Sequence, residues 1–125
     1  MDVVREMNRA FNRQEDRWLD FYSSDVEYVT PPEWPEDRVY RGRESLRTLL
    51  SALREIFEGQ EWRLERVIDV DDSCVVGLAS VHASVQGGQL GQRAAAVHYL
   101  RRGQIVRQLT YFSWEEALEA AGVEG

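Results

Sequence analysis

Two histidines, His82 and His98, have the side chains that ordinarily titrate closest to neutral pH, so they are the first candidates for acid–base chemistry or metal binding. Each lies in a run of β-branched and small residues that predicts a strand. No set of cysteines and histidines in the sequence has the spacing of a zinc site, and we therefore expect no metal and no other cofactor.

Carboxylates and one thiol are the remaining candidates for chemistry. Glu27, Glu33 and Asp69 lie in or beside predicted strands, where a desolvated acid has a raised pKa, although an exposed charge is the commoner outcome. Cys74 has no basic neighbour in the sequence that would lower its pKa, which favours a buried structural thiol. These residue types alone leave the catalytic group unknown.

Hydrophobic periodicity predicts the elements that position these groups. The predicted helices are 3–12, 17–22, 43–57 and 114–121, and the predicted strands are 25–30, 61–70, 73–85, 93–101 and 104–114. The loop 31–41 between the first strand and the long helix contains three prolines and Trp34, which is typical of a stiff lid over a cavity mouth.

The order of these elements predicts an α+β fold. Four strands follow the long helix in succession, and they are longer than the usual five or six residues, so we expect a curved, mostly antiparallel sheet. Such a sheet would wrap around the long helix together with the two N-terminal helices. The space left between the sheet and the helices would form a cone-shaped pocket.

Length and charge limit the function classes. The chain has 125 residues, which fits a single domain over residues 1–125. Its 22 acidic and 15 basic residues give a formal charge of −7, which disfavours binding to nucleic acid or to an anionic membrane surface. A charged N-terminus, no apolar run long enough to span a bilayer and a single cysteine predict a cytoplasmic protein.

Four segments resemble the SnoaL-like branch of the nuclear transport factor 2 superfamily. They occur in the expected order over nearly the whole chain, at 25–33, 40–44, 100–107 and 116–122. The resemblance implies a cone-shaped fold with a deep apolar cavity, commonly a homodimer formed through the sheet. Members of this superfamily include polyketide cyclases, ketosteroid isomerases, dehydratases, epoxide hydrolases and non-catalytic binders, so the fold alone does not determine the function.

Ketosteroid isomerase chemistry is disfavoured by the residues at the aligned positions. That reaction needs a base at the end of the first strand, a tyrosine from the first helix and a protonated acid on the penultimate strand. The resemblance aligns Thr30, Met7 and Val97 with these roles. A threonine cannot take a proton from carbon near neutral pH, so we expect a different reaction or none.

The same alignment predicts which side chains line the pocket. They are mostly apolar and aromatic, with a few hydroxyls and one amide, which suits a small hydrophobic molecule. The predicted lining residues are Met7, Trp18, Tyr28, Thr30, Phe57, Val97, Tyr99, Gln108, Thr110 and Phe112. Each of them could instead simply fill the core, as aromatic side chains often do.

The alignment also places both histidines on the outer face of the sheet, beside small residues such as Ala94 and Ala96. We therefore predict that His82 and His98 contribute to a homodimer surface. If a bulge inverted the strand, the two imidazoles would instead enter the cavity and become the best general bases in the chain.

The functional prediction is a small apolar or aromatic ligand bound in the cone. If the protein is an enzyme, we expect a cyclase, isomerase or dehydratase that acts near a carbonyl, with Tyr28, Tyr99, Gln108 and Thr110 orienting an oxygen. The alternative is a module that binds a ligand or a second subunit without catalysis. A carboxylate or imidazole projecting into the cavity would favour the enzyme.

Overall fold

The computed structural model describes residues 2–34, 39–85 and 87–123. Its helices are α1 (Asp2–Asn12), the 3-10 helix η1 (Asp16–Phe21), α2 (Arg43–Ile56) and α3 (Trp114–Ala120). Its strands are β1 (Tyr22–Val29), β2 (Val39–Arg41), β3 (Glu58–Asp71), β4 (Cys74–Val85), β5 (Gly88–Arg101) and β6 (Gln104–Tyr111).

The six strands form one curved sheet in the order β2-β1-β6-β5-β4-β3. Neighbouring strands are antiparallel except for β1 and β6, which run parallel. Strands β3, β4 and β5 are 14, 12 and 14 residues long. They are longer than the strands of an ordinary sheet and can therefore bend around the helices. The predicted α+β fold is confirmed.

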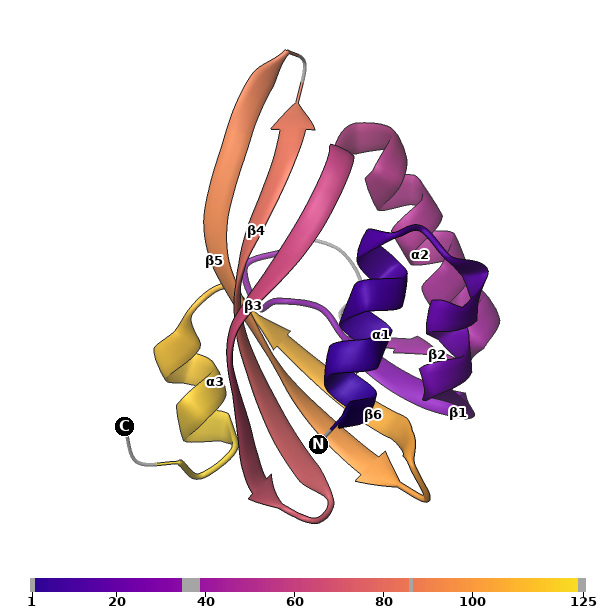
Figure 1. Ribbon diagram of the computed structural model, residues 1–125, viewed down its shortest axis with the longest axis vertical. Coiled ribbons are helices and arrows are strands. Elements are labelled where there is room, and N and C mark those ends of the chain that lie inside the picture. The colour runs from indigo at the N-terminus through magenta and orange to yellow at the C-terminus, as the bar shows by residue number, and fades with distance from the viewer. Residues whose placement is uncertain (1, 35–38, 86, 124–125) are drawn as a thin grey trace.

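Helices α1 and α2 cover one face of the sheet, and α3 covers the other (Figure 1). On α2, the spacing of Leu46, Leu49 and Leu50 places all three on one buried face. They pack with Val4 and other α1 residues against the inner face of the sheet and form the larger of two apolar cores. Within the described residues, no helix is long and apolar enough to cross a bilayer.

Helix α3 is held against the outer face by its first residue. The indole Nε1 of Trp114 donates to the backbone oxygens of Ala79 and Ala94, at 2.9 and 3.0 Å. Ala117 on the same helix joins the second core, with Ala95 and Val97 of β5. The outer face of β4 and β5 is therefore packed tightly where α3 crosses it.

Several element boundaries differ from the predicted ones. The first strand starts at Tyr22 rather than at residue 25, and the helix before it is a 3-10 helix. Strand β2 lies in the segment predicted as a loop and pairs with the end of β1. Of that predicted lid, residues 35–38 lie outside the described residues, whereas Trp34 is described.

Candidate functional site

A cavity of about 160 Å³ lies between the inner face of the sheet and helices α1 and α2. Its floor is made by small residues on two paired strands: Gly77 and Ala79 on β4, and Ala94 and Ala96 on β5. Because these side chains barely rise above the backbone, the curved sheet and the helices leave space that larger residues would fill. The small residues at these positions of the sequence therefore create the cavity.

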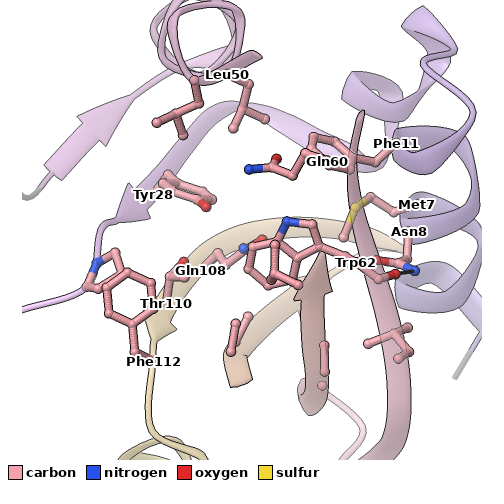
Figure 2. Close-up of a pocket in the computed structure, with 18 of the residues that line it drawn as sticks. Met7, Asn8, Phe11, Tyr28, Leu50, Gln60, Trp62, Gln108, Thr110 and Phe112 are labelled. Atoms are coloured by element: carbon pink, nitrogen blue, oxygen red, sulfur yellow. Dashed lines mark hydrogen bonds between the residues drawn. The ribbon is translucent and has the colours of Figure 1, made fainter. Parts of the chain in front are cut away.

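Aromatic side chains from several elements form the walls of the cavity. Trp18 meets Phe11 and Tyr22 edge to face, with ring centroids 5.6 and 5.7 Å apart. On the other side, Trp34 and Phe112 pack with centroids 6.3 Å apart. Figure 2 shows the side chains of Tyr28, Gln108 and Trp62 around the same space. The cavity is thus apolar and rich in flat surfaces.

A row of polar groups crosses this apolar space. The hydroxyl of Tyr22 donates to Oε1 of Gln108 at 2.8 Å, and Gln108 lies directly opposite His98 on the neighbouring strand. Tyr28 on β1 flanks Gln108 on its other side. Tyr22, Gln108 and His98 are buried, which makes their hydrogen bonds important for stability.

His98 is a titratable group in a strongly altered environment. Only 3% of its surface is exposed, and burial lowers its pKa to about 4, an effect that the amide of Gln108 partly opposes. The ring is therefore neutral at pH 7. Among the described residues, Nδ1 of His98 has no hydrogen-bond partner of acceptable geometry. A neutral imidazole with one free ring nitrogen can donate or accept a hydrogen bond according to its tautomer.

Thr110 and Tyr28 form a second polar group in the cavity. Burial raises the pKa of Tyr28, and the Thr110 hydroxyl beside it offsets part of that rise. Thr110 is 5% exposed, and its Oγ1 makes no hydrogen bond of acceptable geometry within the described residues. Both side chains are neutral near pH 7 and can bind a neutral oxygen.

Charged groups are absent from the lining of this cavity as far as the described residues define it. Glu27 forms ion pairs with Arg41 and Arg107 on the surface, and Glu33 and Asp69 are exposed. Cys74 is buried on the outer side of the sheet, and burial raises the pKa of its thiol. The described residues contain no group of three or more His, Cys, Asp or Glu side chains that could hold a metal ion.

Seven of the ten predicted pocket residues line the cavity: Met7, Trp18, Tyr28, Phe57, Gln108, Thr110 and Phe112. Thr30 is buried but is not among the lining residues. Val97 and Tyr99 lie on the opposite face of the sheet, in and beside the second core. The prediction that these two residues face the pocket is therefore wrong.

Strand register explains this error: the β5–β6 pairing shifts by one residue between Tyr99 and Leu100, and the β4–β5 pairing gives His98 the same inward orientation. Val85 pairs with Gly88, so only two residues separate the paired ends of the strands. This register pairs odd-numbered residues of β4 with even-numbered residues of β5, for example Val75 with His98. Because Gly77, Ala79 and Val81 face the cavity, the even-numbered residues from Gln92 to His98 face it too.

The two histidines are consequently on opposite faces. His98 lines the cavity, which contradicts its predicted place on a dimer surface, whereas the lining residues on either side of His82 are Val81 and Ala83. His82 thus projects from the outer face, where its ring lies 3.3 Å from Ser80 Oγ. The inversion that we considered for both imidazoles therefore applies to His98 alone, and the β5–β6 pairing has a register shift next to it, between Tyr99 and Leu100.

Sequence reasoning also missed several lining residues. Tyr22 was not predicted, because it lies at the end of the expected second helix. Trp62 and Gln60 on β3 also line the cavity, and so do Ala94 and Ala96, which we expected on the outer face. The sequence did contain a signal for the cavity, because one face of two adjacent strands lacks large side chains. The small residues at alternate positions are Gly77, Ala79, Ala94 and Ala96.

Comparison with known proteins agrees with this fold. The family model of the SnoaL-like domain matches residues 4–108. No sequence among curated proteins matches the chain. A nuclear transport factor 2-like protein of unknown function from Burkholderia pseudomallei superposes with a TM-score of 0.81 at 17% identity, covering 95% of this chain and 94% of that one.

Two further solved structures are informative. A proposed polyketide cyclase from Xanthomonas campestris superposes with a TM-score of 0.76 at 20% identity, covering 95% of this chain and 93% of that one. TerC, co-crystallised with polyporic acid, superposes with a TM-score of 0.80 at 16% identity, covering 94% of this chain and 96% of that one. At these identities the likeness establishes the fold only.

Proposed function

Because the chain belongs to the SnoaL-like domain family, we propose that it binds a small apolar or aromatic molecule in the cavity between the helices and the sheet. One observation carries this proposal: the cavity is apolar and aromatic but contains His98 and Thr110, buried polar side chains with unpartnered atoms. Such a site suits a hydrophobic molecule with a few polar atoms. TerC, which has a similar fold, was co-crystallised with polyporic acid, and this supports the binding of a small organic molecule by the fold.

The chemistry we propose is cyclisation, isomerisation or dehydration near a carbonyl, with His98 as the acid–base group. The neutral ring is a weak proton acceptor by itself, because burial disfavours its charged form. A carbonyl oxygen that gains negative charge beside the ring would raise its pKa and stabilise the proton there. Gln108 and Tyr28 then orient the oxygen, and Tyr99, which faces away from the cavity, has no such role.

The experiment is to identify what the purified protein retains. We expect denaturing extraction followed by mass spectrometry to release a small apolar compound in about equimolar amount. The compound is then incubated with the protein and with the His98→Phe variant. Turnover by the native protein alone supports an enzyme, and unchanged recovery supports the alternative, a non-catalytic binding module. If neither a retained compound nor any binding of small aromatic molecules is found, the proposed function is wrong.

We also propose that two copies pair through the outer face of the sheet. Partly buried apolar side chains surround the second core there, among them Ile68, Leu109 and Tyr111, and His82 lies on the same face. A homodimer would cover them. Sedimentation velocity over a wide concentration range tests this, and a monomer at every concentration would contradict it.

The unpaired, buried Cys74 suits the reducing cytoplasm that we propose for this protein.

A further inference from the structure

The two unpartnered polar atoms of the cavity belong to neighbouring positions on paired strands. His98 on β5 pairs with Gln108 on β6, and Thr110 follows two residues later, opposite Ala96. Such diagonal neighbours lie roughly 7 Å apart on one face of a sheet. His98 and Thr110 are 3% and 5% exposed, and both line the cavity. A ligand could therefore meet both groups at once.

The size of the cavity limits what can lie between these two groups. A cavity of about 150 Å³ lined by apolar side chains accommodates one benzene molecule in another protein. The volume here is about 160 Å³, so a single ring fits between the floor and the helices. The aromatic side chains of Tyr28, Trp62 and Phe112 offer flat surfaces against which a planar ring can pack.

The electrostatics of the cavity limit the charge of the ligand. The described lining residues include no arginine and no carboxylate, so an ionised ligand would lose its hydration without gaining a counter-charge. Thr110 can donate or accept a hydrogen bond, and so can Nδ1 of His98, according to the tautomer. A hydroxyl or a carbonyl oxygen satisfies either group.

We propose that the ligand is an uncharged single-ring compound with two oxygen atoms, one bound by His98 and the other by Thr110. This inference rests on the proposed function, because it assumes that the cavity binds a small molecule. It adds the size of the ligand, its lack of charge and the number of its polar atoms.

The test compares four probes of one-ring size at pH 7: toluene, phenol, resorcinol and benzoate. Calorimetry or competition measures the affinity of each. We expect resorcinol to bind at least tenfold more tightly than toluene, with phenol between them, because each neutral hydrogen bond contributes several-fold. Benzoate should bind more weakly than phenol.

Matched variants assign the two contacts. Thr110→Val keeps the shape of the side chain and should weaken resorcinol binding several-fold, whereas Thr48→Val on the exposed side of α2 should leave it unchanged. His98→Phe should weaken resorcinol binding to a similar extent, and His82→Phe on the outer face should not. Neither cavity variant should weaken toluene binding. Circular dichroism confirms that each variant is folded.

Two results would overturn the inference in distinguishable ways. If toluene and resorcinol bind equally well and Thr110→Val changes neither affinity, the cavity binds apolar molecules without a two-oxygen contact, and only this inference fails. If none of the four probes binds, toluene included, the proposed function fails with it.

Discussion

His98 on β5 lies directly opposite Gln108 on β6, and both side chains face the cavity. The carbonyl oxygen of Gln108 accepts the Tyr22 hydroxyl hydrogen bond at 2.8 Å, so the amide is held from one side. On its other side lies an imidazole that burial keeps neutral. This row links the stability of the sheet to the chemistry of the cavity, because substituting Tyr22 or Gln108 removes a buried hydrogen bond beside the imidazole.

The first prediction concerns pH. The pKa of His98 is about 4 in the folded protein, below its ordinary value of 6.5, so between these values the unfolded chain binds a proton that the folded chain does not. Lowering the pH through this window therefore destabilises the fold. We expect the free energy of unfolding to fall by about 2 kcal/mol between pH 7 and pH 4.5, measured by urea denaturation.

Two histidine variants provide the control for this pH dependence. His98→Phe should remove most of the slope between pH 6.5 and 4, whereas His82→Phe should retain it. The lowered pKa values of Asp25 and Asp71, caused chiefly by hydrogen bonds from Ser23 and Ser73, affect stability at lower pH, below about 3.8. An unchanged slope in His98→Phe would show that another group titrates in this window.

The second prediction concerns the Tyr22–Gln108 hydrogen bond. Tyr22→Phe leaves the Gln108 oxygen without its donor, and Gln108→Leu leaves the Tyr22 hydroxyl with only the weak acceptor Sδ of Met7, 3.6 Å away. Because both groups are buried, each substitution should lower the free energy of unfolding by about 1–3 kcal/mol. The double variant should lose clearly less than the sum, since neither orphaned group remains. Additive losses in denaturant unfolding would mean that the two side chains do not interact.

Much of the fold could be predicted from the sequence because it depends on local patterns. The spacing of Leu46, Leu49 and Leu50 indicates one buried helix face whatever surrounds it, and alternation in 73–85 indicates a strand. β2 was missed because three residues after a proline-rich loop carry almost no periodic signal. Its pairing with the end of β1 depends on tertiary position rather than on local sequence.

The site was harder to predict because it depends on register. A shift of one residue turns every side chain of a strand to the other face of the sheet. The alignment with the family therefore placed Val97 toward the cavity and His98 away from it, the reverse of their positions in the structure. The inward position of His98 depends on where the β4–β5 turn falls and on the register shift between Tyr99 and Leu100, and local alternation indicates neither of them. The proximity of Tyr22 to Gln108, 86 residues later, had no comparable signal in the sequence.

The third prediction concerns the attachment of α3. The Trp114 indole donates to two backbone oxygens, and the guanidinium of Arg93 lies 4.4 Å from the centroid of its ring. Trp114→Phe keeps an aromatic ring but removes the donor, so we expect a loss of about 1–3 kcal/mol in the free energy of unfolding. Arg93→Gln removes only the stacked cation and should lose about 1 kcal/mol or less. Equal losses from the two variants would mean that stacking, not the hydrogen bonds, holds the helix.

The fourth prediction uses two adjacent alanines that face opposite ways. Ala94 lines the cavity, whereas Ala95 is fully buried in the second core, which also contains Ala117 of α3. Ala94→Leu places a larger side chain in open space, so stability should change by less than about 1 kcal/mol while the cavity loses its ability to bind toluene. Ala95→Leu overpacks a filled core and should cost about 1–3 kcal/mol.

Binding measured on the same two proteins completes this comparison. Ala95→Leu leaves the cavity lining unchanged, so the fraction that stays folded should still bind toluene with native affinity. A cavity that serves as the binding site requires binding to be lost in the stable variant and kept in the unstable one. If Ala94→Leu still binds toluene and Ala95→Leu does not, the binding site lies outside the cavity. The comparison is clear because one substitution changes the cavity volume and the other changes the stability.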